Sequence, residues 1–347
     1  MHIPDGYLSP ATCVAAYGVA APFWYQANRR VKDVLRSRAA PLVALFAAFS
    51  FTVMMFNVPI PGGTTAHAVG GTLIAVVLGP WAAVVSVSTA LVIQAIFFGD
   101  GGITAIGANS FNMAIALPLV GYAVYRVLAG SGPTPRRRTI AAAVGSYAGI
   151  NVAALLAGLE LGIQPLFWTE GGRALYNPYG LAVTVPAMLL AHLTIAGFAE
   201  AAVTGLAVAY LLRTHPELFT PEAAHAQGMA AVGLGKLGGV LVAVLGLMVV
   251  LTPLGLLAPG SADFEWGAEE LRGMVGYMPA GLARLDQLWG LAPLRDYQLP
   301  GAGGSFWEQA PGYILSAVVG VALIFAVVYA VRVALSRRMV QDRKSVV

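Results

Sequence analysis

Cysteine and charge are both scarce in this sequence. Cys13 is the one cysteine among 347 residues, so the chain can form neither an internal disulfide nor a cysteine-based metal cluster. Charged residues make up 10% of the chain and apolar residues 58%, and the mean hydropathy is +0.75. Soluble domains carry about 25% charged residues. The composition therefore excludes an ordinary soluble globular protein.

The sequence also lacks a nucleotide-binding signature. A phosphate loop needs the pattern G-x-x-x-x-G-K-[ST]. The nearest match, residues 233–237 (GLGKL), has neither that spacing nor the Ser or Thr. Any ATP hydrolysis on which this chain depends must therefore come from partner proteins.

Long apolar stretches are what the chain has instead. Several approach the ~20 residues that an α-helix needs to cross a bilayer. We expect helices within residues 8–26, 39–58, 67–98, 105–128, 139–159, 181–212, 238–257 and 313–331. The Gly79-Pro80 pair should divide the third stretch into two short helices, whereas Pro186 and Gly197 leave open whether 181–212 is one helix or two. The predicted fold class is all-α, a polytopic transmembrane bundle of about 7 helices plus 2 C-terminal transmembrane helices.

Basic residues gather in short polar segments between the helices. They lie within residues 29–38, 126–138, 213–236 and 332–344. The formal charge of +4 comes largely from these clusters, which are typical of the cytoplasmic loops of a membrane protein, so we expect no nucleic-acid partner. The positive-inside rule, by which cytoplasmic loops carry the excess of Lys and Arg, predicts an extracytoplasmic N-terminus and a cytoplasmic C-terminus. It also places the loop that ends at His67, and the turn at residues 100–102, outside.

The first two residues can chelate a metal ion. The Met1 α-amine, the His2 amide and the His2 ring can close adjacent five- and six-membered chelate rings on one ion, once the amide has lost its proton. One corner of the resulting square stays open for a second histidine. Planar nitrogen coordination favours nickel or copper over zinc or magnesium.

An alternative is that His2 simply belongs to a disordered terminus. Two features argue against it. Pro4 and Pro10 restrict the backbone on either side of a turn. The segment also has no Lys or Arg before Arg29 and lacks the uninterrupted apolar core of a secretory signal. We therefore expect the N-terminus to hold one shape. Because the large side chain of His2 should block removal of the initiator methionine, we also expect Met1 to keep its own α-amine.

His67 is the candidate for the fourth ligand. It follows a loop, residues 59–66, that contains two prolines and a glycine pair, and it opens an apolar helix. Taken alone, a histidine there can equally cap the helix or lie among lipid headgroups. The charge pattern, however, places it on the same side of the membrane as His2. The Met1 amine, the His2 amide and ring, and the His67 ring would then supply four nitrogens.

Four segments of the chain strongly resemble one known family. They are residues 1–10 (MHIPDGYLSP), 62–67 (GGTTAH), 78–83 (LGPWAA) and 97–109 (FFGDGGITAIGAN). The family is the substrate-binding membrane component of nickel and cobalt energy-coupling-factor (ECF) transporters. The resemblance implies that the metal is held by the amine of Met1, the amide and ring of His2 and the ring of His67.

A second resemblance concerns the C-terminal part. Residues 230–347 are similar to a fused small accessory subunit of the same system, which has two helices and an extracytoplasmic loop. Together the resemblances imply three parts. These are a metal-binding transmembrane domain over 1–213, a cytoplasmic linker over 214–236 and an accessory two-helix transmembrane region over 237–347.

The function that the resemblance implies is capture of extracytoplasmic Ni(II) and its delivery across the cell membrane of a prokaryote. Co(II) uptake is the alternative, although a start of MHIPDG is more usual for nickel members. The implied partners are a transmembrane coupling protein, cytoplasmic ATPases and membrane lipid. The metal is the transported ligand, and we expect no cofactor and no enzyme activity in this chain.

Seven polar residues near the expected outer face are candidates to support the ligands. They are Asp5, Asn57, Thr64, Thr65, Asn109, Ser110 and Asn112. A ligating imidazole usually donates its second N–H to an oxygen, and Asp5 is expected to fix the N-terminal loop by accepting backbone hydrogens. Each residue can equally satisfy a helix end or an interhelical contact.

Two ionisable residues lie inside an apolar stretch, where charge is costly. His192 and Glu200 are eight residues apart, so they share one face if the helix is continuous. We expect them to form an interhelical contact or part of a transit route rather than to be primary ligands. His215 and His225 fall in the expected cytoplasmic linker and should be solvated.

An intramembrane metalloenzyme is the weaker alternative. In such an enzyme a metal would activate water beside a carboxylate base. The chain has no His-Glu-x-x-His motif, and we expect no carboxylate to adjoin either candidate histidine. A metal sensor would use the same site, and only directional uptake separates it from a transporter.

Overall fold

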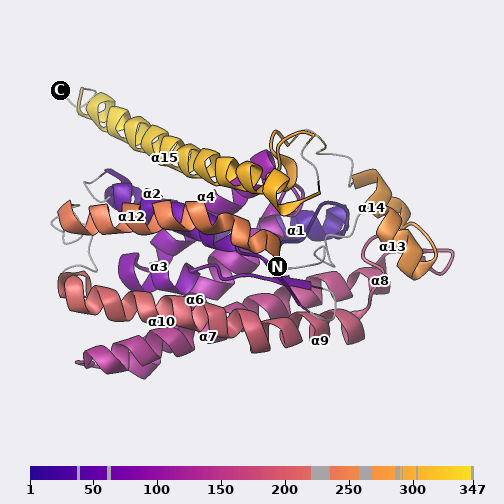
Figure 1. The fold of residues 1–347 in the computed structure, drawn as a ribbon, viewed down its shortest axis with the longest axis horizontal. Helices are drawn as coiled ribbons and strands as arrows, with labels where there is room; N and C mark the ends of the chain where they lie inside the picture. The colour runs from indigo at the N-terminus through magenta and orange to yellow at the C-terminus, as the bar shows by residue number, and fades with distance from the viewer. Residues whose placement is uncertain are drawn as a thin grey trace.

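The computed structural model places the chain in a bundle of helices that run along one long axis (Figure 1). It describes residues 1–36, 40–60, 64–219, 235–257, 268–285, 290, 292–301 and 304–344. Within these residues, 6 helices are long and apolar enough to cross a membrane: Pro80–Phe98, Ile106–Ala129, Pro135–Phe167, Leu181–Thr214, Leu237–Leu257 and Phe306–Arg337. The expected all-α polytopic bundle is confirmed.

The first helix, α1 (Pro10–Arg36), is longer than the sequence suggested. We expected it to end near residue 26, before a basic loop, whereas its last turns include Arg29, Arg30 and Lys32. Straight-chain basic residues are good helix formers, so the helix continues beyond its apolar part.

A short hairpin leads the chain to His67. It follows α2 (Ala40–Met54), which is almost wholly buried, and consists of β1 (Val58–Ile60) and β2 (Thr64–Ala66) in antiparallel pairing. Because β2 ends at the residue before His67, the hairpin fixes the direction in which that histidine enters the bundle. The helix α3 (Gly71–Leu78) begins four residues after His67.

Gly79 separates α3 from α4 (Pro80–Ile93). Its φ of 92° lies in a region that residues other than glycine rarely adopt, and Pro80 then opens the next helix. The predicted division into two short helices is confirmed. The π-helical turn η1 (Gln94–Phe98) extends α4 and brings the chain to Asp100.

The next two spans pack closely through small residues. The first comprises α5 (Ile106–Asn109), the π-helical η2 (Ser110–Ala116) and α6 (Leu117–Ala129). The second is α7 (Pro135–Gly162), continued by α8 (Gln164–Phe167). A Cβ on Gly149 would lie 2.4 Å from the Leu117 carbonyl oxygen, so only glycine permits this approach. A small hairpin of β3 (Thr169–Glu170) and β4 (Arg173–Ala174) follows.

The stretch that the sequence left open is one long helix with a π-helical turn. It consists of α9 (Leu181–Ala191), η3 (His192–Ala196) and α10 (Gly197–Thr214). The π turn begins at His192, and a Cβ on Gly197 would meet the His192 carbonyl oxygen at 2.4 Å. A 3-10 turn, η4 (Pro216–Phe219), ends this part of the chain. His225 and most of the expected linker lie outside the described residues.

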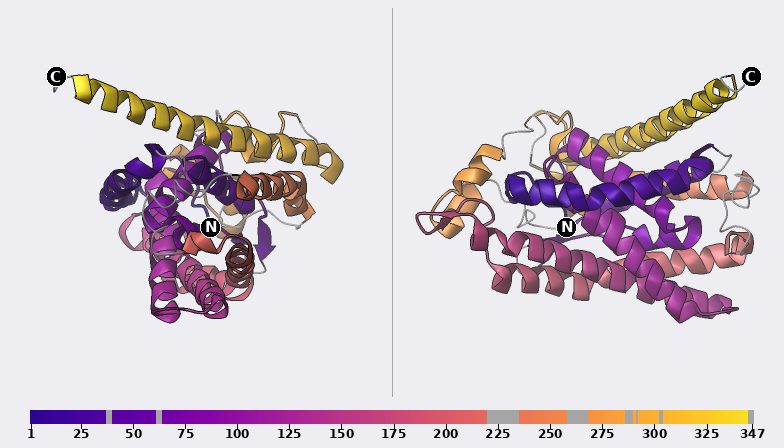
Figure 2. Two further views of the ribbon diagram at one scale, coloured as in Figure 1. Left: turned by 90° about the vertical axis from the view of Figure 1, so that its left-hand side faces the viewer. Right: turned by 180° about the vertical axis from the view of Figure 1, so that it is seen from behind.

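The C-terminal part packs against the outer side of α2. It comprises α12 (Gly235–Leu251), η5 (Thr252–Leu257), α13 (Ala268–Val275), α14 (Ala280–Leu285), η6 (Arg295–Tyr297) and α15 (Phe306–Lys344). A Cβ on Gly320 would overlap the Phe51 ring, which shows how closely α15 lies against α2. Seen from behind, α13 and α14 lie together at one end of the bundle and the last turns of α15 project from the other (Figure 2).

Candidate metal site

The N-terminal segment lies inside the bundle rather than on its surface (Figure 1). Met1 and His2 are each 5% exposed and Ile3 is 1% exposed. Asn109 Oδ1 accepts a hydrogen bond from Ile3 N at 2.8 Å, and Asn109 Nδ2 donates to Ile3 O at 3.1 Å. Gly102 N donates to the same carbonyl at 2.9 Å. The start of the chain is therefore fixed against the segment that leads into α5.

The Asp5 carboxylate fixes the same segment a few residues further on. It accepts hydrogen bonds from Ile103 N at 3.0 Å and Thr104 N at 2.8 Å, and another from the Thr104 hydroxyl. Hydrogen bonds to an ionised group are stronger than neutral ones. Asp5 thus accepts backbone hydrogens from a neighbouring loop, as the sequence led us to expect.

His67 faces the N-terminal amine. The Met1 amine nitrogen lies 3.4 Å from His67 Nε2, and the rings of His2 and His67 stack with centroids 4.9 Å apart and planes 24° apart. Because a carbonyl can only accept, His67 Nδ1 is the donor in its 3.2 Å contact with Ala68 O. That hydrogen bond fixes the tautomer and leaves the Nε2 lone pair directed at the amine.

The His67 ring is neutral under ordinary conditions. Burial lowers the pKa of His67 well below its usual value, and the charges of the N-terminal amine, His2 and, to a lesser extent, His192 lower it further. The ring therefore takes up a proton only in acid. Since neutral imidazole is the form that binds a metal ion, His67 needs no deprotonation before it can act as a ligand.

Asp100 is a site residue that the sequence analysis did not select. Its Oδ1 lies 3.1 Å from His2 Nδ1, so the expectation that no carboxylate adjoins either histidine is wrong. Tyr297 OH donates to Asp100 Oδ2 at 2.5 Å, and Gln94 Nε2 donates to the same oxygen at 3.3 Å. The sequence feature that could have indicated Asp100 is its place in the turn at residues 100–102, which is expected on the same side of the membrane as His2. No local pattern links it to Tyr297.

Burial and hydrogen bonding act in opposite directions on this group of residues. Burial alone would raise the pKa of Asp100, but the His2 ring and the Tyr297 hydroxyl outweigh it, so the pKa lies below its usual value. Burial, followed by the Asp100 charge, raises the pKa of Tyr297 well above its usual value. At neutral pH Asp100 is therefore ionised, and Tyr297 keeps the proton that it donates.

Tyr297 occupies a strained backbone conformation. Its φ is 60°, and a residue with a side chain in such a conformation costs on the order of 1–3 kcal/mol. Its surroundings hold it there, because Ser316 Oγ donates to Tyr297 O at 3.0 Å and the ring stacks on Phe98 with centroids 5.0 Å apart. Through this one hydroxyl, the C-terminal part of the chain supports the carboxylate beside His2.

The nitrogens expected from the sequence lie together, but one contact, between His2 and Asp100, must change before a metal ion can bind. His2 Nδ1 is the ring nitrogen that can close a six-membered chelate with its own amide, and it is also the atom beside Asp100. A metal ion bound in the expected chelate must displace this carboxylate from His2. The carboxylate would then rely on Tyr297 and Gln94 for its hydrogen bonds.

Main-chain nitrogens are an essential part of this candidate site. In the part of the chain that the structure describes, no group of three or more His, Cys, Asp and Glu side chains could hold a metal ion. The two imidazoles of His2 and His67 therefore need the Met1 amine and the His2 amide to complete a donor set. This explains why side-chain patterns alone do not reveal the site.

The remaining polar candidates have different surroundings. Asn112 Nδ2 donates to Glu160 Oε2 on α7 at 2.7 Å, which is an interhelical contact. Ser110 Oγ and Asn57 Oδ1 are buried and have no hydrogen-bond partner among the described residues. Thr64 and Thr65 lie in β2, and their side chains fall outside the described part of the structure.

Glu200 holds the segment that carries His67. Its carboxylate is fully buried and accepts hydrogen bonds from Val69 N at 2.7 Å and Gly70 N at 3.0 Å. Gly70 immediately precedes α3, so the carboxylate also lies at the positive end of that helix dipole. Glu200 thus makes an interhelical contact, one of the two roles expected for it.

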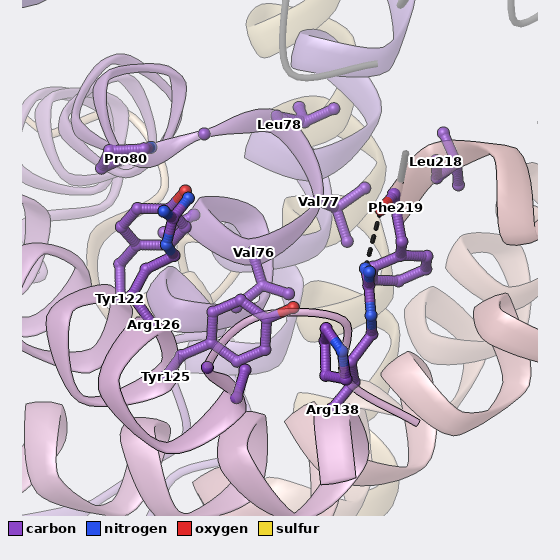
Figure 3. A pocket seen from close by; sticks show the side chains of 15 residues that line it. Val76, Val77, Leu78, Pro80, Tyr122, Tyr125, Arg126, Arg138, Leu218 and Phe219 are labelled. Carbon is purple, nitrogen blue, oxygen red and sulfur yellow. Dashed lines mark hydrogen bonds between the residues drawn. The ribbon is translucent and has the colours of Figure 1, made fainter. Parts of the chain in front are cut away.

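A separate pocket of about 440 Å³ lies at the far end of α3 from His67 (Figure 3). Tyr122, Tyr125 and Arg126 line it from α6, and Arg138 lines it from α7, where Arg138 Nη1 donates to Phe219 O at 2.7 Å. None of its lining residues is acidic, and two arginines repel a cation. This pocket is therefore unsuited to holding a metal ion.

Replacing Gly102 by alanine is expected to weaken metal binding without removing any ligand. A Cβ at Gly102 would lie 2.4 Å from Asp5 N, so the N-terminal segment must move away. Overpacking of this kind costs about 1–3 kcal/mol, which corresponds to roughly a 5- to 150-fold loss in affinity. Titration with Ni(II) would measure it. Gly180→Ala is the matched control, because no atom lies within 4 Å of a Cβ there. Equal affinities in the two variants would contradict the expectation.

Tyr297→Phe is expected to lower metal affinity while it keeps the ring contacts. Once the metal has displaced Asp100 from His2, the carboxylate has, within the described ranges, only the Tyr297 hydroxyl and Gln94 as donors, and losing one hydrogen bond to a charged group costs about 1.5–3 kcal/mol. At ~1.4 kcal/mol per tenfold change, the dissociation constant should rise about tenfold. Tyr329→Phe is the control, since Tyr329 is on the same C-terminal part and 66% exposed. An unchanged constant in Tyr297→Phe would separate the C-terminal part from the site.

The helix bundle and its buried cluster of nitrogen donors define a polytopic membrane protein of the metal-transport class. Residues 2–218 match the family described as "cobalt uptake substrate-specific transmembrane region", and residues 237–337 match the PDGLE domain. The chain belongs to this cobalt-uptake family, with a PDGLE domain after it.

Relatives match over nearly the whole chain. The "Fused nickel transport protein NikMN" of Rhodobacter capsulatus is 52% identical over 344 residues, which cover 94% of this chain and 95% of the relative. The "Probable fused nickel transport protein LarMN" of Lactiplantibacillus plantarum is 44% identical, with coverage of 94% and 95%. A crystal structure titled as a truncated transition metal transporter aligns with a TM-score of 0.59 at 54% identity, covering 62% of this chain and 100% of that one.

Proposed function

We propose that this chain captures Ni(II) outside the cell and delivers it across the membrane. The observation that carries the proposal is that the Met1 amine, the His2 ring and the His67 ring lie in contact with one another inside the bundle. Together with the His2 amide they would make a planar set of four nitrogens, which suits nickel better than zinc or magnesium. Met1, His2 and His67 are the proposed ligands. Asp5, Asn109 and Glu200 hold the segments that carry them.

The relatives support nickel as the cargo. The two fused relatives that span 94% of this chain are named for nickel, whereas the "Cobalt transport protein CbiM" of Geobacter sulfurreducens is 30% identical and matches 78% of the chain. Cobalt is the second candidate, and the description of the matching family supports it.

The direction of transport follows from the distribution of charge. The basic segments should face the cytoplasm, which puts the N-terminus and the two histidines on the outer side and the C-terminus inside. Residues 1–213 would bind the metal, 214–236 would link the two parts in the cytoplasm, and 237–347 would act as the accessory region. A transmembrane coupling protein and cytoplasmic ATPases would supply the energy, because the sequence contains no phosphate loop.

The test is titration of the purified full-length chain with Ni(II) and with Co(II) while visible absorption is recorded. We expect a yellow, diamagnetic Ni(II) complex that binds more tightly than Co(II) and that is lost in His2→Ala. Tighter Co(II) binding would keep the transporter and change its cargo. Failure of the folded protein to bind either ion would overturn the proposal.

A further inference from the structure

His192 presents a buried nitrogen lone pair that the proposed metal site does not use. The residue is 0% exposed and opens the π-helical turn η3. Its Nδ1 lies 2.7 Å from Met188 O. A carbonyl can only accept, so Nδ1 carries the proton and Nε2 carries the lone pair. In the part of the chain that the structure describes, Nε2 has no hydrogen-bond partner.

An imidazole in this state is poised to bind a metal ion. Metal-ligating histidines usually donate one ring N–H to a carbonyl or carboxylate, which orients the other nitrogen toward the metal. A buried acceptor without a partner costs free energy, so its presence calls for an explanation. π-helical turns are also found frequently at functional sites.

The fold places His192 beside the His67 segment. The strand β2, which ends one residue before His67, packs against both α9 and η3. Two residues beyond His67, Val69 N donates to Glu200 further along the same helix. His67 therefore lies between two points that are both fixed to the helix carrying His192.

Release is the difficult step for a carrier that holds an ion through four nitrogens, three of them in one chelate. Square-planar ions with eight d electrons exchange ligands by adding a fifth ligand before they lose one. A buried site offers little water for that role. A neutral imidazole held next to the chelate would supply the fifth ligand.

We propose that His192 Nε2 is a further ligand of the transported ion, which binds it as the N-terminal chelate opens. The new nitrogen–metal bond forms first. The bond from the metal to the His2 amide nitrogen then breaks, and that nitrogen takes a proton from a water molecule, which leaves as hydroxide. The metal keeps its oxidation state throughout. This inference rests on the proposed nickel function, because it concerns how the same site lets go of its ion.

Two substitutions separate the role of each ring nitrogen. His192→Asn keeps an N–H near the position of Nδ1, and so keeps the hydrogen bond to Met188 O, but removes Nε2. His192→Gln instead keeps a polar atom near the position of Nε2 and loses the bond to Met188 O. The purified full chain is loaded with Ni(II) and mixed with excess EDTA, and the decay of the nickel absorption gives the release rate. Thermal unfolding of each variant checks the fold.

We expect both variants to bind Ni(II) with the native spectrum and affinity. His192→Asn should release it about tenfold more slowly, equivalent to ~1.4 kcal/mol in the barrier, and His192→Gln should release it at a rate closer to native. Native release from His192→Asn, with a defect in His192→Gln, would assign the residue a packing role and overturn the inference. Loss of equilibrium affinity in His192→Asn would overturn it as well.

The failures of the two proposals are distinguishable. If the native chain forms no yellow Ni(II) complex, the proposed function fails and takes this inference with it. If the complex forms and His192→Asn releases nickel at the native rate, the inference alone fails.

Discussion

A chain that carries Gly-Ser-Gly ahead of Met1 is expected to lose high-affinity nickel binding. The extension turns the Met1 amine into a peptide nitrogen and so removes one end of the chelate with His2. Three more residues must also fit where Met1 is 5% exposed. We expect the affinity to fall by more than about 1,000-fold, or ~4 kcal/mol at 25 °C. A competition titration of the purified protein measures it.

The length of the extension matters for this experiment. One added residue would give X-Met-His, in which an amine, two amides and the His2 ring form a complete four-nitrogen chelate that does not need His67. Three residues move the new amine out of reach of such a chelate. The same tripeptide appended after Val347 is the matched control. Undiminished affinity in the N-terminally extended chain would contradict a role for the Met1 amine as a ligand.

His67→Ala is the second change for which we expect a large effect. It removes the only proposed ligand that is distant in sequence from the N-terminus, and the Met1 amine loses the partner that lies 3.4 Å away. Nickel affinity should fall about 100-fold, or ~2.7 kcal/mol. Water would fill the vacated position, and because oxygen donors split the d orbitals less than nitrogen donors, the absorption maximum should move to longer wavelength.

His215→Ala is the matched control for this variant. His215 is also a histidine, but its Nδ1 lies 3.0 Å from Glu217 at the far end of the helix that contains His192. Its removal should leave both the affinity and the spectrum unchanged. A native spectrum in His67→Ala would remove His67 from the site. Equal losses in both variants would mean that the measurement reports histidine content rather than a specific ligand.

Much of the fold could be predicted because its signals are local. A glycine followed by proline breaks a helix wherever it occurs, and Gly79 and Pro80 do so here. Apolar stretches long enough for a bilayer likewise predicted the bundle. The end of α1 differs from the expected boundary near residue 26 because Arg29 and its neighbours continue the helix, since long basic side chains are good helix formers.

The residues of the candidate site likewise fall into two groups, those that local sequence reveals and those that depend on contacts between distant parts of the chain. Met1 and His2 are adjacent, so their chelating capacity can be seen in a dipeptide, and charge counting alone put His67 on their side. Asp100 could not be paired with Tyr297, because the two are 197 residues apart and meet only where η6 packs against η1. The tautomer of His192 likewise depends on a single contact with Met188 O, which no periodicity encodes.

The hydrogen bond between Tyr297 and Asp100 has a consequence for gene dosage. Because both residues belong to one polypeptide, every copy of the candidate metal site is made with its supporting hydroxyl, in a fixed one-to-one ratio. A tethered group acts at an effective concentration on the order of millimolar. The hydrogen bond can therefore re-form each time it breaks, and no separate subunit has to diffuse to the site. In an arrangement with two separate chains, the same bond would depend on how much of the second subunit the cell produces.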